Sequence, residues 1–288
     1  MNNYVIFTDS GSDLPISLLS KMNIESANLS FYFSEQDYSK GNEEFNSSLF
    51  YSKLRNGKTA KTSAVNPERF KERFLKIMNS GNDILYLGFS SALSSTYNSA
   101  RIAMETVRKE NPKSKIIIVD TKSASLGLGL IVYLTSKKKS EGASIEAAAE
   151  FAKNLIKNVC HWFTVEDLSY LKRGGRISHS SAFFGNMLGI KPIMYMDNGG
   201  YLKPYDKVRG RLASIEELAR KYGENHDTDK GNTVFISHAD CIQDAKLLGK
   251  ILYDNYGAKT ELIADIGAVI GSHAGPGTLA LFFIGKSR

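Results

Sequence analysis

Three apolar strands in the first half of the chain each end in a polar turn that leads into a helix. We expect these strands at Tyr4–Phe7, Ile84–Leu87 and Lys115–Val119, and Ala27–Phe33 alternates well enough to add another. Alternation of buried strands with amphipathic helices predicts an α/β fold with an open, mostly parallel sheet. Ligands of such sheets bind beyond the carboxyl ends of the strands, so the polar turns are candidate sites.

The turn after the strand Ile84–Leu87 is rich in hydroxyl groups. Gly88 permits the turn, and a helix is expected from about Ser95. The hydroxyl side chains of this serine elbow are Ser90, Ser91, Ser94, Ser95 and Thr96. Free N–H groups and the positive end of the helix dipole favour an oxyanion here, such as a carboxylate or a phosphate. The alternative is that one serine caps the helix and the others face solvent.

Two further polar turns are open to interpretation. Asp9 and Asp13 follow the first strand, where they would either contact a ligand or only organise the turn and cap the next helix. Thr62 and Ser63 lie upstream of Asn66, the natural cap of the following helix. Capping therefore leaves the hydroxyls of Thr62 and Ser63 without a structural role.

A nearly all-apolar helix is expected at Ala124–Ser136. Gly127 and Gly129 lie inside it, and each glycine costs a helix on the order of 1 kcal/mol relative to alanine. Some other group should therefore pack very close to this helix. Close packing within the fold and a long apolar ligand along the helix are the two alternatives.

The second half of the chain predicts a separate domain. Ile177–Leu188 is expected as a helix, and Ile190–Met196 and Tyr201–Tyr205 form a hairpin around a glycine-rich turn. Strand, helix and strand patterns follow. We therefore predict an N-terminal α/β domain over residues 1–163 and a C-terminal α/β domain with a mixed sheet over residues 164–288.

The net charge of +7 does not indicate nucleic-acid binding, because the lysines are dispersed and aromatic residues do not interleave with them. The longest basic run, Lys137–Lys139, ends an apolar helix, where cations offset the helix dipole. A mildly basic surface would still favour an acidic protein partner or a transient contact with an anionic membrane.

Cysteine use and hydropathy favour a cytoplasmic protein. Cys160 and Cys241 are the only cysteines, too few for a disulfide framework, and are interpreted as reduced core thiols. The sequence opens directly on a strand, without the pattern of a signal peptide. The longest apolar run, around Leu126–Leu134, is too short to span a bilayer.

Nine short motifs occur in an order and spacing that together are specific, although each alone is weak. They are TDSGSDLP at Thr8–Pro15, TS at Thr62–Ser63, SSALSSTYNSA at Ser90–Ala100, VDTKSASLGLG at Val119–Gly129, EDLSYLKRGGRIS at Glu166–Ser178, IKPI at Ile190–Ile193, KVRG at Lys207–Gly210, SHAD at Ser237–Asp240 and GAVIGSHAGPG at Gly267–Gly277. This pattern resembles the DegV family, the fatty-acid-binding subunits that present an acyl chain to a separate bacterial fatty acid kinase.

The resemblance implies two domains with a long-chain fatty acid in an apolar tunnel between them. It implies that the carboxylate is held by Thr62, by Ser94 with Ser91 or Ser95 as near alternatives, and by His273. Basic residues of the motifs would dock an acidic kinase surface or neutralise an acyl phosphate, and the competing interpretation is ordinary surface charge. These residues are Arg173, Arg176, Lys207 and Arg209.

Two departures from the family pattern affect the donor set. The turn after TS commonly reads TSQPSP, whereas this chain has Thr62–Pro67. The elbow commonly reads SGTY, whereas Ser95 stands here in place of the glycine. Ser95 therefore adds a side chain close to the expected head group.

No P-loop or kinase glycine loop is visible, so we expect a monomeric, substrate-presenting subunit with no catalytic site, metal or cofactor of its own. The acyl phosphate formed by the kinase would enter phospholipid synthesis. A serine hydrolase is the main alternative, with Ser90 or Ser91 in the elbow and Asp240 with His273 or His238 as partners. A module resembling sugar-phosphate or dihydroxyacetone kinases is the other alternative to a lipid-binding subunit.

Overall fold

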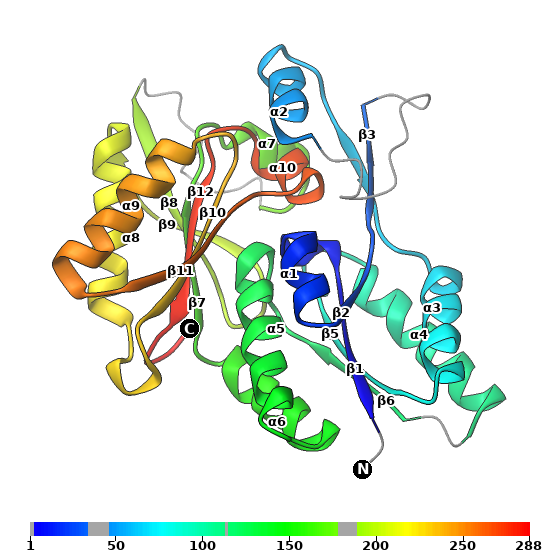
Figure 1. Cartoon of the computed structure of the whole chain (residues 1–288). Coiled ribbons are helices and arrows are strands. Elements are labelled where there is room, and N and C mark those ends of the chain that lie inside the picture. Colours follow the sequence, from blue (N-terminus) through cyan, green and yellow to red (C-terminus); the bar gives the residue numbers. More distant parts are fainter. Residues whose placement is uncertain (1–2, 34–45, 113–114, 178–188) are drawn as a thin grey trace.

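The computed structural model describes residues 3–33, 46–112, 115–177 and 189–288 of the 288-residue chain. Over these residues, helices surround and separate two main β-sheets, one parallel and one mixed (Figure 1). The α/β fold with two such sheets, predicted from the sequence, is confirmed.

The N-terminal sheet has four parallel strands in the order β2-β1-β5-β6. The strands are β1 (Tyr4–Asp9), β2 (Ile24–Ala27), β5 (Asp83–Gly88) and β6 (Ile116–Asp120). Its helices are α3 (Pro67–Asn79) and α4 (Thr96–Glu110) on one face and α5 (Ser125–Ser140) and α6 (Ile145–Ile156) on the other. Because the strands are parallel, the three polar turns meet at one edge of the sheet.

The second sheet has six strands in the order β11-β10-β12-β7-β8-β9. The strands are β7 (Val159–Thr164), β8 (Ile190–Met196), β9 (Leu202–Arg209), β10 (Thr233–His238), β11 (Lys259–Asp265) and β12 (Leu279–Ile284). Only β10 and β11 pair in parallel. Helices α8 (Arg211–Asn225) and α9 (Ile242–Tyr256) cover the outer face (Figure 1).

Strand β7 belongs to the mixed sheet by its hydrogen bonds. It pairs antiparallel with β12 and with β8, although most of it precedes residue 164. A domain boundary between residues 163 and 164 stays a prediction. Strand pairing groups residues 159–163 with the C-terminal strands instead.

Helix α5 lies between the two sheets and contacts strands of both (Figure 1). A Cβ on Gly127 would stand 2.1 Å from Nε2 of His161, and one on Gly129 would stand 2.9 Å from the carbonyl oxygen of Ser12. Close packing within the fold, one of the two alternatives for this helix, therefore accounts for both glycines.

A separate two-stranded sheet forms from β3 (Ser30–Tyr32) and β4 (Lys61–Ser63). A single strand over Ala27–Phe33 is therefore wrong, because Ala27 ends β2 and the chain then leaves the parallel sheet before β3. Thr62 lies in β4 opposite Phe31, and not in a turn. This small sheet carries Thr62 away from the parallel sheet.

Helix α10 (Ala268–Ala274) was not predicted, and it packs against α2 (Ser47–Arg55). A Cβ on Gly271 would stand 2.5 Å from the Tyr51 hydroxyl oxygen, so this glycine permits the contact. Tyr51 also donates its hydroxyl to the carbonyl of Ile266 at 2.6 Å. The remaining short helices are α1 (Ile16–Lys21), α7 (Ser169–Arg173) and the 3-10 turns Ser10–Ser12 and Thr228–Lys230.

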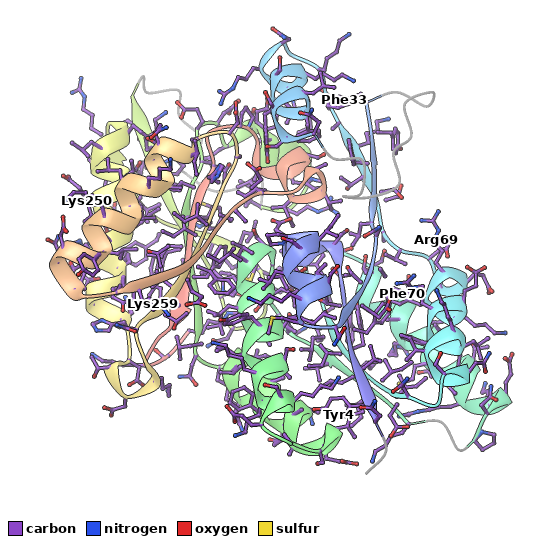
Figure 2. The ribbon with its side chains drawn as sticks, viewed as in Figure 1. Tyr4, Phe33, Arg69, Phe70, Lys250 and Lys259 are labelled. Carbon is purple, nitrogen blue, oxygen red and sulfur yellow. The ribbon has the colours of Figure 1, made fainter. Side chains whose placement is uncertain are left out.

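Side chains fill the space between the ribbons, as Figure 2 shows. Phe70 is fully buried, whereas the side chains of Lys250 and Lys259 are about 70% exposed. No helix among the described residues is long and apolar enough to cross a membrane. The helix predicted at Ile177–Leu188 lies, apart from Ile177, outside the described residues.

Candidate functional site

A cavity of about 260 Å³ lies between the two sheets. The N-terminal half contributes apolar walls such as Phe89 and Ala124, and the mixed sheet contributes Phe163, Ala280 and Phe282. Most of the lining is apolar, so the cavity suits an elongated hydrocarbon better than a sugar or a nucleotide.

Five polar side chains predicted from the sequence line this cavity. They are Thr62, Ser94, Ser95, Arg176 and His273. They come from β4, from the serine elbow, from the turn after α7 and from α10, segments far apart in the chain. The fold therefore brings a group of hydrogen-bond donors to an otherwise apolar cavity.

The shortest contact in this group joins Thr62 Oγ1 and His273 Nε2, which lie 2.8 Å apart. Burial lowers the pKa of His273 to about 4, and the positive charge of Arg176 adds to the effect. The imidazole is therefore neutral at pH 7. If its Nε2–H donates to Thr62, the threonine hydroxyl is left to donate to a ligand oxygen.

The glycine at position 174 makes room for the histidine. A Cβ at Gly174 would stand 2.3 Å from His273 Nδ1, closer than packed atoms tolerate. The backbone of Gly174 has φ −71°, which any residue adopts, so only the contact with His273 demands glycine. Sequence reasoning missed this role, because nothing local to the RGGR motif marks a partner about a hundred residues later.

We therefore expect Gly174→Ala to weaken ligand binding by displacing His273, with little effect on the backbone of α7. The loss should be about ten-fold, as for one hydrogen bond to a charged group. Titration calorimetry with a fatty acid measures it. In a protein that already carries His273→Ala, Gly174→Ala should reduce the affinity no further. An equal reduction with and without His273 would contradict the role of Gly174 in making room for this side chain.

The serine elbow begins helix α4 beside the cavity. Ser94 Oγ accepts the N–H of Thr96 at 3.2 Å and lies 2.9 Å from Thr96 Oγ1, whereas Ser95, the N-cap residue, makes no capping bond with its side chain. Ser95 is exposed and lines the cavity. A carboxylate near these residues would lie at the positive end of a 15-residue helix.

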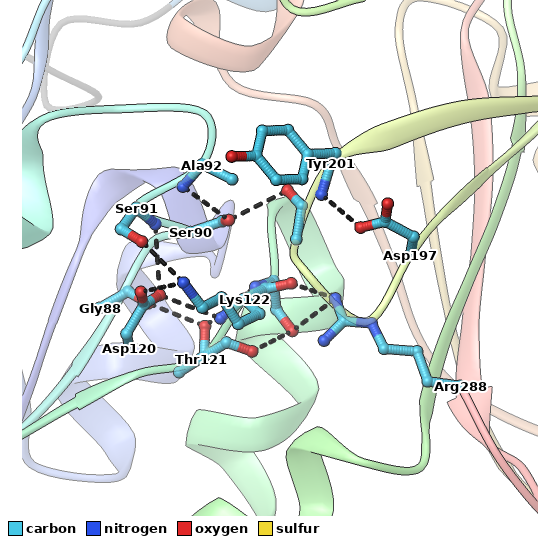
Figure 3. A network of polar contacts seen from close by, with 12 residues as sticks. Gly88, Ser90, Ser91, Ala92, Asp120, Thr121, Lys122, Asp197, Tyr201 and Arg288 are labelled. Carbon is cyan, nitrogen blue, oxygen red and sulfur yellow. Dashed lines mark hydrogen bonds and ion pairs between the residues drawn. The ribbon is translucent and has the colours of Figure 1, made fainter.

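Ser91 points away from this group. Its Oγ accepts a hydrogen bond from Lys122 Nζ at 2.8 Å, and Lys122 also pairs with Asp120 at 2.7 Å (Figure 3). Ser91 does not line the cavity. Of the three serines predicted as alternatives, the structure brings Ser94 and Ser95 to the cavity and leaves Ser91 outside it.

Of the four basic residues predicted from the sequence, one lines the cavity and three lie outside it. Arg176 lines the cavity and donates from Nε to the carbonyl of Leu93 at 3.2 Å, which joins the serine elbow to the turn beside His273. Arg173 is exposed over the ring of Tyr170 at 4.7 Å. Lys207 and Arg209 lie exposed on β9. Arg176 is thus a wall residue of the cavity, while the other three face outward.

The contacts of Ser90 do not favour a serine hydrolase. Ser90 is fully buried and donates its hydroxyl to the carbonyl of Gly200 at 3.0 Å (Figure 3). His273 is bonded to Thr62, and Asp240 pairs with Arg55 at 3.1 Å. Ser90, His273 and Asp240 are therefore engaged elsewhere, and the remaining candidate, His238, lies with Nδ1 3.5 Å from Asp265 Oδ1.

Asp9 and Asp13 do not line the cavity. Asp9 accepts hydrogen bonds from Tyr86, at 2.6 Å, and from the N–H of Phe89 and Gly11. Burial raises its pKa to about 6, against the lowering effect of these bonds. The turn-organising alternative thus describes Asp9.

Comparison with known proteins identifies the family. The model of the DegV family of uncharacterised proteins matches residues 3–286. The chain belongs to the DegV family. A DegV domain-containing protein of Clostridium perfringens is 42% identical over 289 residues, which cover 100% of this chain and 99% of the relative. A DegV relative from Thermotoga maritima named fatty acid-binding protein is 35% identical over 284 residues, 95% of each chain.

Solved DegV structures share the fold over nearly the whole length. A DegV lipid-binding protein of Thermotoga maritima has a TM-score of 0.85 at 33% identity, over 99% of each chain. A DegV protein of Thermus thermophilus, described as binding fatty acid, has a TM-score of 0.87 at 27% identity, over 97% of this chain and 98% of its own. DegV relatives therefore bind fatty acids on this fold.

Proposed function

We propose that this chain binds a long-chain fatty acid in the cavity and presents its carboxylate to a separate fatty acid kinase. The observation that carries the proposal is the pair of Thr62 and His273, hydrogen-bonded at 2.8 Å in a mostly apolar cavity. The fatty-acid-binding relatives support the same ligand class.

The two parts of the ligand are bound by different forces. Apolar walls remove the acyl chain from water, which contributes about 0.8 kcal/mol per methylene. The hydroxyls of Thr62, Ser94 and Ser95 and the guanidinium of Arg176 supply donors for the carboxylate. Arg176 would thereby act at the head group, a position also suited to neutralising an acyl phosphate, one of the two roles implied for it.

The outward-facing basic residues support a protein partner. Arg173, Lys207 and Arg209 would meet an acidic surface of the kinase, and the acyl phosphate formed there would feed phospholipid synthesis. The chain contributes no catalytic group to this transfer. It acts in the cytoplasm as a monomer that exchanges its lipid with the partner and, transiently, with a membrane.

Mass spectrometry of an organic extract tests the ligand class directly. Protein purified without added lipid should release a fatty acid in stoichiometric amount. A folded sample that contains none and binds none on titration would remove the proposal.

The kinase role is tested with Arg209→Ala. Because Arg209 is exposed on β9 and does not line the cavity, fatty-acid affinity should stay within two-fold, while acyl-phosphate formation by the kinase should fall by about ten-fold. Lys203→Ala on the same strand is the matched control, and it should leave both measurements unchanged. Loss of lipid binding and phosphorylation together would point to a structural role for Arg209.

A further inference from the structure

Asp13 is buried, with 4% of its surface exposed, and its side chain bonds two other segments without lining the cavity. Its Oδ2 accepts the hydroxyl of Ser125, at the start of α5, at 2.6 Å. Its Oδ1 accepts the N–H of Gly267, at the start of α10, at 3.0 Å. Ser125 Oγ lies 3.1 Å from Ser237 Oγ at the end of β10, so both sheets meet at this carboxylate.

The Gly267 contact fixes the beginning of the helix that carries His273. Gly267 is the N-cap residue of α10 and has no side chain to satisfy the free N–H groups there. The Asp13 carboxyl group, from the N-terminal half of the chain, accepts the N–H of Gly267 itself, which has no partner within the helix.

Helix α10 is short enough to pass a displacement at its start to its end. Six residues separate Gly267 from His273, about 9 Å at 1.5 Å per residue. Tyr51 holds the same end through the carbonyl of Ile266, and Thr62 holds the far end through the His273 ring. The N–H of Ile266 also donates to the carbonyl of His238 at 2.7 Å, so loss of the Asp13 contact leaves this end held through Ile266 alone.

We propose that Asp13 is a positioning residue for the head-group site, which holds His273 against Thr62 by anchoring the start of α10. Its φ of 51° lies in the left-handed region, which aspartate adopts more readily than most residues, and in this conformation the carboxyl group reaches Ser125 and Gly267 at once. The inference rests on the proposed function of this site.

The test uses the delipidated full-length protein and two variants. One removes the acceptor and the other the donor of the hydrogen bond between Asp13 and Gly267. Asp13→Ala removes both acceptor oxygens, whereas asparagine could still accept from Gly267 and donate to Ser125. Gly267→Pro removes the donor instead, and the φ of −66° at this position suits proline. Asp9→Ala is the matched control, at a second buried carboxyl group of the same motif whose partners lie on β5 and in the serine elbow.

The first readout is the NMR spectrum of the imidazole nitrogens in the ligand-free protein. Only five histidines contribute signals to this spectrum. Both Asp13→Ala and Gly267→Pro should shift the signals of His273, and Asp9→Ala should leave them in place. The second readout is the release rate of bound oleate, which should rise about ten-fold in both variants.

The two readouts separate two kinds of failure. Folded variants with unchanged His273 signals overturn the role of Asp13, whatever the lipid does. If the His273 signals shift but the unsubstituted protein never binds oleate, Asp13 does position His273, but the proposed fatty-acid site is ruled out. Two independent substitutions keep the test decisive if one of them does not fold.

Discussion

Replacing Thr62 by valine should lower the affinity for fatty acids by about 10- to 100-fold, whatever the length of the acyl chain. Valine keeps the shape of threonine and its fit to strand β4, but it removes the hydroxyl that lies 2.8 Å from His273 Nε2. The carboxylate would then be buried with one donor fewer. Titration of the delipidated protein with a series of saturated acids, from octanoate to stearate, measures the effect.

Thr62→Ser is the matched control, because it restores the hydroxyl and should restore most of the affinity. His273→Ala should act in the same direction, and the double variant should lose less than the sum, since the two side chains form one hydrogen-bonded unit. Equal affinity of the threonine and valine proteins would remove the assignment of the head group to this pair.

Local patterns were enough to predict the elements that surround the site. Capping rules separated Thr62 from the helix start at Asn66, and Asn66 does cap α3 by accepting the N–H of Arg69 at 2.9 Å. The cost of glycine in a helix predicted a close approach at Gly127, which the ring of His161 provides. In each case the signal itself is local, although the group that approaches Gly127 lies 34 residues further along the chain.

Contacts between distant segments could not be predicted from local patterns. His273 became a candidate only through the resemblance to a family, and nothing in its own sequence context predicts helix α10 or the Thr62 contact 211 residues away. The distinction between Ser91 and Ser94 is of the same kind. It depends on Lys122, from the next strand's turn, which engages Ser91 outside the cavity.

Charge at the site also depends on packing. No sequence pattern shows whether His273 is charged, whereas burial lowers its pKa to about 4 and leaves the ring neutral at pH 7. Arg176 then supplies the positive charge of the cavity wall, although the resemblance implied for it kinase docking or neutralisation of an acyl phosphate. The burial of each group decides between these roles, and local sequence patterns do not predict that burial.

Replacing Ala280 by phenylalanine should lower the affinity for stearate by about two orders of magnitude. Ala280 lines the cavity from β12 beside Phe163, its partner across the strand pair, so an added ring would occupy space that the acyl chain needs. Loss of three or four buried methylenes at about 0.8 kcal/mol each corresponds to this factor. The same titration series measures it.

Chain length separates this effect from a head-group defect. Ala280→Phe should shift the preference toward shorter acids. The affinity of Ala280→Val for stearate should lie between those of the alanine and phenylalanine proteins, in proportion to the volume of the side chain. Thr62→Val should instead lower affinity by one factor across the whole series, because it removes a donor and no apolar wall. If both variants reduced binding equally at every chain length, the cavity would not be the acyl site, since only a contact with the hydrocarbon can depend on its length.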